Sequence, residues 1–362
     1  MSFLKEVFHK TEQILWSVLL KPFFFSLDPE KVHHFVVGVM KLFSPIFYIR
    51  RPFYNFNING KSHPSLEKEV FGIKFPNPVG LAAGFDKNAE VYKQMSSLGF
   101  GFIEIGTVTP VAQDGNPKKR IFRLVDDYGL INRLGFNNKG VDYAIESLKK
   151  NKNILIGGNI GKNKNTENSD AYKDYEICFN KLYPHVDYFV INVSSPNTPN
   201  LRDLQEKEPL EGIIRNINLS NKKQKERKPI LIKISPDVNK KQIDNIIDIV
   251  KINNIDGIVA TNTSLSRDNL KSKLDLKNQK GGLSGKPIFS KSNNIIKYIY
   301  NKTKGKVPII GVGGIMCPDD AIEKLKSGAS LIQLYTGFIY EGPSIIKKIN
   351  KKIIEEKLFK IT

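Results

Sequence analysis

The chain has 362 residues, 40% of them hydrophobic, which suits one large α/β barrel or two smaller domains around a sizeable core. Its two cysteines are too few for a disulfide framework and stand in no metal-ligand spacing, so we expect a reducing compartment and no metal site. The formal net charge of +20 would suit nucleic acid, an anionic membrane surface or an acidic ligand, but the lysines are scattered and no nucleic-acid-binding motif accompanies them, so we expect no nucleic-acid partner.

The first fifty residues carry two apolar patterns at helical spacing. Asp28-Pro29 is typical of a helix N-cap followed by proline at the first helical position. The apolar stripe after it comprises Val32, Phe35, Val36, Val39, Met40 and Phe43. An earlier, rougher stripe comprises Phe3, Leu4, Val7, Phe8, Ile14, Leu15, Val18 and Leu19. No run reaches the roughly 18 apolar residues of a membrane span, and Glu6 and Glu12 argue against a signal peptide. We therefore predict a helical segment over residues 1–50 that either packs on the rest of the chain or lies in a bilayer surface.

From residue 77 onward, short apolar runs alternate with amphipathic segments. The runs with strand character are Val79–Ala83, Phe102–Thr107, Ile154–Ile160, Tyr188–Val193, Ile230–Ile234, Gly257–Asn262, Val307–Val312 and Leu331–Thr336. The helical segments include Ala89–Leu98, Val141–Lys149, Asp170–Leu182, Ile243–Ile252 and Pro318–Leu325. Continuous apolar strands separated by helices predict a parallel sheet. Eight such units predict an α/β fold, a (β/α)₈ barrel over residues 51–362 with the N-terminal helices as an extension.

Polar residues gather where these runs end, which is the catalytic face of this barrel type. The fourth run leads into a loop in which Ser195 stands among prolines and asparagines. Asparagine offers both a donor and an acceptor, which suits the edge of a small planar ring such as a pyrimidine. The alternative is a surface turn, because Ser-Pro-Asn is also ordinary turn chemistry.

Two further features point to an anionic ligand. Lys233 stands inside the apolar run Ile230–Ile234, where an unpaired ammonium group is costly, so an inward Lys233 needs a negative partner such as a reduced flavin. The alternative is a surface lysine at a strand end. After the seventh run, Gly311-Val312-Gly313-Gly314 would let backbone N–H groups approach a phosphate, although a tight turn would use the same glycines.

Several ordered motifs between about residue 22 and residue 342 resemble those of the membrane-associated, quinone-reducing class of dihydroorotate dehydrogenases. They are Leu81–Lys87, Gly106–Pro110, Gly115–Pro117, Ile131–Asn137, Ile191–Arg202, Gly281–Gly285 and Val312–Ile315. The first twenty or so residues exceed the shorter bacterial pattern of that family.

The resemblance implies a role for each matching residue. Ser195 matches the catalytic base. FMN contacts are implied at Ala83, Gly84, Phe85, Asp86, Lys87, Thr107, Asn159, Asn192, Lys233, Thr261, Gly285, Gly314, Tyr335 and Thr336. Substrate contacts are implied at Lys87, Asn132, Arg133, Leu134, Gly135, Phe136, Asn192, Asn197, Asn262 and Thr263. Quinone contacts are implied at His33, Arg123 and Tyr335.

The resemblance also implies the reaction and its setting. The enzyme would oxidise (S)-dihydroorotate to orotate in pyrimidine biosynthesis, with FMN as hydride acceptor and a membrane quinone as final acceptor. It would be a peripheral, monomeric protein on the cytoplasmic side of the inner membrane, attached to an anionic membrane surface. One alternative is a soluble dihydroorotate dehydrogenase using fumarate or NAD. In those classes the position that corresponds to Ser195 resembles a cysteine, so the serine argues against them. The other is a basic nucleic-acid-binding barrel without catalysis.

Overall fold

The computed structural model describes residues 2–54, 57–58, 61–151 and 153–359, and its centre is a closed barrel of eight parallel strands. The barrel strands are β5 (Val79–Leu81), β6 (Phe102–Val108), β9 (Ile156–Ile160), β10 (Tyr188–Asn192), β11 (Ile230–Ile234), β12 (Gly257–Ala260), β14 (Ile309–Val312) and β15 (Leu331–Leu334). They pair in this order, and β15 closes onto β5. The predicted fold class is confirmed, and the eight predicted runs are the eight barrel strands.

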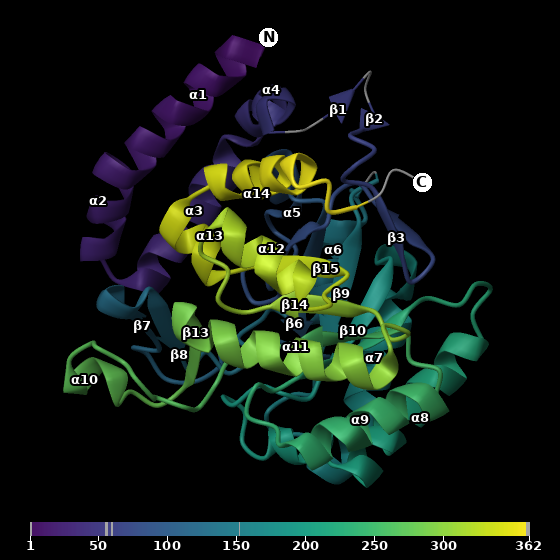
Figure 1. The fold of residues 1–362 in the computed structure, drawn as a ribbon. Helices are drawn as coiled ribbons and strands as arrows, with labels where there is room; N and C mark the ends of the chain where they lie inside the picture. The colour runs from purple at the N-terminus through teal and green to yellow at the C-terminus, as the bar shows by residue number, and fades with distance from the viewer. Residues whose placement is uncertain (1, 55–56, 59–60, 152, 360–362) are drawn as a thin grey trace.

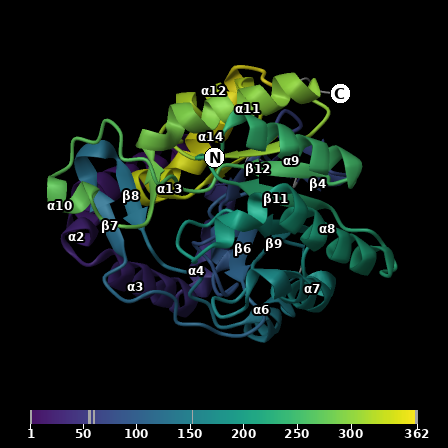
Figure 2. The same ribbon diagram turned by 90° about the horizontal axis from the view of Figure 1, so that it is seen from below.

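Helices surround this barrel (Figures 1 and 2). They are α5 (Tyr92–Ser97), α6 (Val141–Leu148), α7 (Ala171–Leu182), α8 (Lys207–Lys222), α9 (Lys240–Ile252), α11 (Phe289–Thr303), α12 (Pro318–Lys326), α13 (Thr336–Glu341) and α14 (Ser344–Glu355). The segments predicted to be helical fall on α5, α6, α7, α9 and α12.

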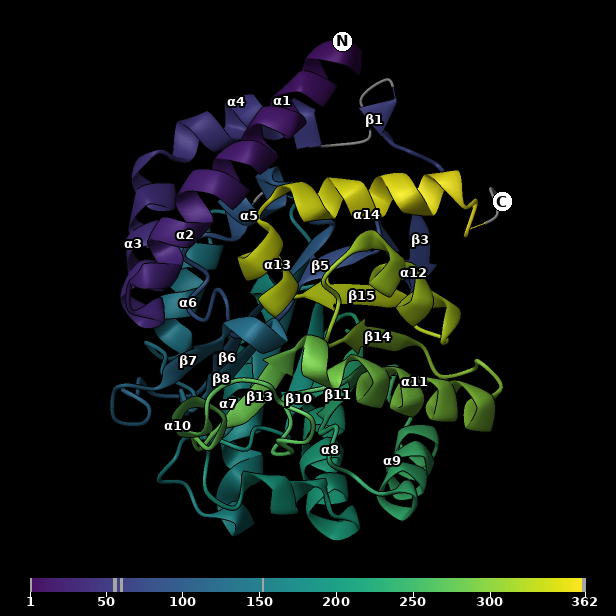
Figure 3. The same ribbon diagram turned by 60° about the vertical axis from the view of Figure 1, so that its left-hand side comes forward.

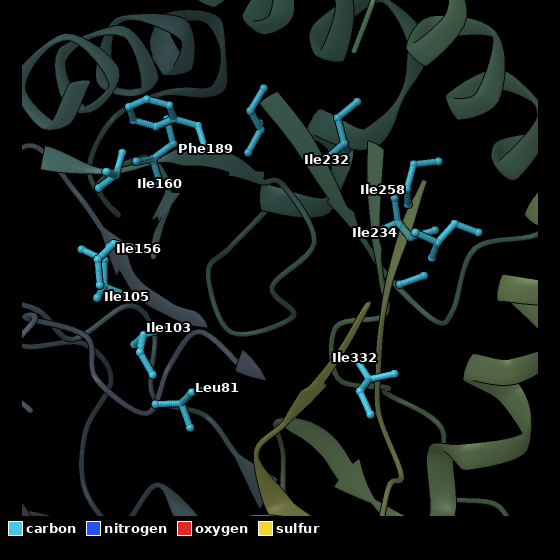
Figure 4. Close-up of a cluster of buried hydrophobic side chains, with 14 of the residues drawn as sticks. Leu81, Ile103, Ile105, Ile156, Ile160, Phe189, Ile232, Ile234, Ile258 and Ile332 are labelled. Atoms are coloured by element: carbon cyan, nitrogen blue, oxygen red, sulfur yellow. The ribbon is translucent and has the colours of Figure 1, made fainter. Parts of the chain in front are cut away.

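Each barrel strand is buried on both sides, and its residues alternate between two environments. In β11, Ile232 packs into the layer between strands and helices, whereas Leu231 belongs to the separate cluster inside the barrel. Figure 4 shows outer-layer side chains spaced around the barrel, among them Leu81, Ile160 and Ile258. Because side chains alternate between the two faces along a strand, Lys233, two residues after Leu231, also points into the barrel.

Three small antiparallel sheets of the described residues were not predicted. The hairpin of β3 (Lys68–Val70) and β4 (Ile73–Phe75) contributes Val70 and Phe75 to the cluster inside the barrel. A three-stranded sheet joins β7 (Ile121–Leu124), β8 (Gly129–Asn132) and β13 (Gly282–Gly285). It lies beside the barrel near the short helix α10 (Leu274–Lys277), as Figure 3 shows. A further short pair consists of β1 (Asn57–Ile58) and β2 (Lys61–Ser62).

The N-terminal extension is helical throughout. Helix α1 (Ser2–Ile14), a π-helical stretch (Leu15–Leu20) and α2 (Lys21–Ser26) follow one another and lie beside α3 (Pro29–Leu42) and α4 (Ser44–Tyr54) in Figure 3. The Asp28 carboxylate accepts hydrogen bonds from the backbone N–H groups of Glu30 and Lys31, which confirms the predicted N-cap. Among the described residues, no single helix is long and apolar enough to cross a bilayer, although α3 and α4 together, bent by 90°, would pass by length and composition. The boundary at residue 50 stays a prediction.

Candidate functional site

A polar cavity opens at the carboxyl ends of the barrel strands. Its walls combine residues from the ends of β5, β6, β10, β11, β12, β14 and β15 with residues of the β8–β13 sheet. Predicted site residues in this lining are Ala83, Gly84, Lys87, Thr107, Asn132, Leu134, Gly135, Phe136, Asn192, Ser195, Asn197, Lys233, Thr261, Asn262, Thr263, Gly285, Gly314, Tyr335 and Thr336. Residues widely separated in sequence therefore converge on one space.

A buried ion pair lies at the base of this cavity. The Lys233 Nζ atom is 3.6 Å from a carboxylate oxygen of Glu104, whose side chain is fully buried on β6. The same carboxylate accepts hydrogen bonds from the side-chain amides of Asn159 at 2.8 Å and Gln333 at 2.6 Å. The negative partner that an inward Lys233 requires is therefore present within the chain. Sequence reasoning missed Glu104, although a carboxylate inside the apolar run Phe102–Val108 is the same kind of signal as Lys233.

Asn192, at the end of β10, connects the strand ends through its side-chain amide. Its Nδ2 atom donates to Thr107 Oγ1 at 2.8 Å and to Asn159 Oδ1 at 3.2 Å. Its Oδ1 atom accepts from the Ser194 hydroxyl and from Asn262 Nδ2. Because donors and acceptors are matched, the orientation of these amides is fixed by the fold.

Ser195 is 6% exposed and follows the end of β10. Its hydroxyl oxygen accepts a hydrogen bond from the backbone N–H of Asn197 at 3.2 Å. The neighbouring Thr198 hydroxyl is buried and has no hydrogen-bond partner among the described residues. The fold therefore fixes the position of the Ser195 hydroxyl, as a general base requires.

The Ser195 loop is tied to its neighbours by Arg202, which sequence reasoning also missed. The Arg202 guanidinium donates to the carbonyl oxygens of Ser194 at 3.2 Å and Thr263 at 2.9 Å. It also pairs with the Asp237 carboxylate at 2.9 Å. This arginine therefore joins two loops that line the cavity.

Several polar atoms in the cavity wall have no partner among the described residues. They are the side-chain oxygens of Asn197, Thr261 and Gln333, all of which are buried. Buried polar groups in native proteins almost always form hydrogen bonds. These oxygens are therefore suited to accept hydrogen bonds from a polar ligand.

Two glycines at the rim of the cavity, one after β14 and one at the end of β13, allow the backbone to pack closely. Gly314 has φ +82° and a Cβ there would approach the backbone of Phe289 to 2.5 Å. Gly285 has φ +93° and a Cβ there would approach the carbonyl oxygen of Tyr128 to 2.3 Å. Both positions require glycine, and Thr336 lies beside them in the same lining. This arrangement fits a phosphate group.

Lys87 lies in the wall of the polar cavity and donates to the carbonyl oxygen of Gly84 at 2.6 Å. Burial lowers the pKa of its ammonium group to about 8, and the positive charge of Arg120 acts in the same direction. A partly buried lysine that forms no ion pair with the described residues is suited to an anionic ligand.

A second, mostly apolar cavity of about 400 Å³ lies between the N-terminal helices and the barrel. His33, Arg123 and Tyr335, the predicted quinone contacts, all line it. The His33 ring packs edge-on against Phe85, and Phe85 in turn contacts Tyr335. Burial lowers the pKa of His33 to about 3, with Lys87 adding to the effect, so this imidazole is neutral.

The two cavities share a wall. Residues that line both are Lys87, Asn132, Leu134, Ser284 and Tyr335. A molecule in the apolar cavity therefore lies against the same side chains as a molecule in the polar cavity.

Four of the predicted FMN and substrate contacts lie outside the polar cavity. Phe85 and Asp86 line the apolar cavity instead, and the Asp86 carboxylate accepts from the backbone N–H groups of Glu90 and Val91. Asn159 is fully buried beneath the lining. Arg133 is directed away from both cavities, toward Gln279. Their predicted ligand contacts stay predictions. The described residues contain no group of three or more potential metal ligands.

Comparison with known proteins gives one consistent result. Residues 65–357 match the family model described as Dihydroorotate dehydrogenase. A curated protein from Christiangramia forsetii, named Dihydroorotate dehydrogenase (quinone), is 53% identical over 348 residues, covering 95% of this chain and 100% of that protein. One of the same name from Idiomarina loihiensis is 47% identical, with 91% and 98% covered. The solved structure of Eimeria tenella DHODH in complex with ferulenol is similar with a TM-score of 0.83 and 34% identity, covering 91% of each chain.

Proposed function

The chain belongs to the dihydroorotate dehydrogenase family, and we propose that it oxidises (S)-dihydroorotate to orotate, with a membrane quinone as the final electron acceptor. The observation that carries this proposal is the pair of cavities with a common wall. One is polar and presents an ordered set of amides, whereas the other is apolar and lies under the N-terminal helices. Two substrates of opposite polarity match these two cavities.

The polar cavity fits FMN. Gly285, Gly314 and Thr336 would hold the phosphate, and Lys233 and Thr261 would face the ring system. FMN, when bound, supplies the acceptor for the hydride that leaves C6 of dihydroorotate. The positive charge of Lys233 would favour negative charge on the adjacent ring.

Orotate or dihydroorotate would lie against the amide groups near Ser195. Asn197 donates to Asn132 Oδ1 at 3.0 Å, and this pair with Asn262 presents donors and acceptors to the planar ring. The charged Lys87 would bind the substrate carboxylate. Ser195 would remove the proton from C5 and pass it onward. Burial of this loop excludes bulk water from the reacting atoms.

The N-terminal helices would bring the apolar cavity to a membrane surface. Exposed apolar side chains on them are Ile14, Leu15, Val18, Leu19, Phe23, Phe35, Leu42, Phe43, Ile46 and Ile49. Lys10, Lys41 and Arg51 are exposed on the same segment and would favour anionic lipid. The side chains of residues 2–5, including Phe3 and Leu4 of the predicted stripe, lie outside the described residues. A peripheral position on the cytoplasmic side of the inner membrane and a monomeric state belong to this proposal.

The test begins with the purified protein. A flavin absorbance spectrum and release of FMN, identified by mass, are expected. Anaerobic mixing with dihydroorotate should then bleach the flavin, and a long-tailed quinone should restore its colour. Absence of flavin, or reoxidation by fumarate or NAD in place of quinone, would contradict the proposal.

A further inference from the structure

Arg120 lies outside every set of predicted contacts, yet it is 6% exposed and joins the walls of both cavities. It stands just before β7, and each branch of its guanidinium has a different partner. Its Nε and Nη2 atoms donate to the carboxylate of Glu30, with the shortest contact at 2.7 Å. Its Nη1 atom donates to the carbonyl oxygens of Asp114 and Asn116, both at 2.7 Å.

The Nη1 branch leads to the substrate side. The carbonyl group of Asn116 is held by Arg120, and the Asn116 side chain then donates to the carbonyl oxygen of Asn197 at 2.8 Å. Asn197 stands two residues after Ser195, and the N–H of Asn197 holds the Ser195 hydroxyl. The position of the Ser195 loop therefore depends on a hydrogen-bonded connection that ends at Arg120.

The other branch leads to the apolar cavity. Glu30 is 7% exposed in the first turn of α3, one turn before His33. Burial alone would raise the pKa of this carboxyl group, but the Arg120 guanidinium holds it below its usual value. The ion pair is bidentate and buried, which is the geometry that fixes a side chain most firmly. It ties the turn that precedes His33 to the segment just before β7.

We propose that Arg120 is a positioning residue for both ligands, holding the Ser195 loop through Asn116 and the His33 turn of α3 through Glu30. This inference rests on the proposed function, because it takes the two ligands to be orotate and a quinone. A lysine could not replace it, since one ammonium group cannot reach a carboxylate and two carbonyl groups in the planar arrangement that a guanidinium provides.

The proposal assigns a different result to each connection. Asn116→Ala removes the side-chain link to Asn197, together with the hydrogen bond from Asn116 to the carbonyl oxygen of Arg133. Glu30→Gln weakens the helix branch, and Arg120→Met removes both branches. Arg227→Met is the control, because Arg227 forms a bidentate but more exposed ion pair with Asp256 at the opposite end of the barrel. Orotate binding is measured by calorimetry on the flavin-loaded protein. Binding of decylubiquinone is followed through the fluorescence of Trp16, which lines the apolar cavity and is the one tryptophan of the chain.

Arg120→Met should weaken the binding of both ligands by about tenfold. This factor corresponds to roughly 1.4 kcal/mol of binding free energy. Asn116→Ala should weaken orotate alone, and Glu30→Gln should weaken the quinone more than orotate. Arg227→Met should change neither dissociation constant. A purely structural role would lower the folded fraction while leaving the dissociation constants of the folded protein unchanged.

Unchanged affinity for either ligand in Arg120→Met would overturn the proposal. If Arg120→Met does not fold, Arg120→Lys is tested in its place. The proposal then expects weaker binding of both ligands, and weaker binding of one ligand only would contradict it. Failure of the wild-type protein to bind orotate or decylubiquinone would instead refute the proposed function, so the two failures are distinguishable.

Discussion

The mouth of the barrel and the N-terminal cavity are built from different interactions. At the barrel mouth, side-chain amides such as those of Asn192 and Asn159 belong to a hydrogen-bonded network within the chain. The N-terminal cavity is lined mostly by apolar side chains, and hydrogen bonds such as that from Trp16 to the carbonyl oxygen of Tyr340 hold its wall together. A preordered polar site selects one planar ligand, whereas an apolar cavity tolerates variation in a lipid tail. The shared wall at Tyr335 brings the two kinds of site together.

The largest expected effect tests the chemistry of the barrel mouth. Ser195→Ala should slow flavin reduction by about 10²–10⁴-fold, because a positioned general base is worth about that factor. Orotate should still bind, since under this proposal the asparagines would provide the ring contacts. Single-turnover reduction by dihydroorotate measures this rate, and a wild-type rate would remove Ser195 from the mechanism.

The second prediction tests whether the buried ion pair between Lys233 and Glu104 stabilises the fold. Lys233→Met should lower the free energy of unfolding by about 3–5 kcal/mol, because it leaves the buried Glu104 carboxylate without its cation. The double variant Glu104→Gln, Lys233→Met should regain part of this loss. Chemical denaturation measures both, and additive losses would show that the two groups do not interact.

The third prediction concerns Lys87 in the shared wall and the dependence of orotate affinity on pH. The pKa of Lys87 is lowered to about 8, so the charged form that an orotate carboxylate prefers is lost as the pH rises through that value. Orotate affinity should then fall by about tenfold per pH unit above the pKa. Calorimetry across this range measures the change. Lys87→Arg should abolish the pH dependence, because arginine stays charged, and a persisting dependence would assign it to another group.

The smallest expected effect concerns the N-terminal cavity. His33→Ala should weaken quinone binding by about tenfold, the loss expected for one aromatic contact of about 1–1.5 kcal/mol. Because its pKa is lowered to about 3, His33 is neutral at physiological pH, and wild-type quinone affinity should not vary with its titration. Reoxidation kinetics at several quinone concentrations measure the effect, and slowed flavin reduction in this variant would contradict the division between the cavities.

Sequence reasoning predicted the barrel because its strands are continuous apolar runs, and it predicted the α3 N-cap because Asp28-Pro29 is a local signal. It also singled out Lys233, since a charge inside such a run is unusual. It missed the β7–β8–β13 sheet, whose third strand lies some 150 residues beyond the second and pairs Gly282 with Asn132. The Glu30–Arg120 pair was missed for the same reason, because its partners are 90 residues apart and neither is unusual locally.

The direct test of two separate cavities is whether orotate and a quinone bind at the same time. Decylubiquinone should quench Trp16 fluorescence in the flavin-loaded protein, and saturating orotate should leave the full amplitude of that quenching in place, because Trp16 lines the apolar cavity and Ser195 and Asn197 line the polar one. If saturating orotate instead abolishes the quenching, the two ligands compete for one site and the account of two cavities is wrong.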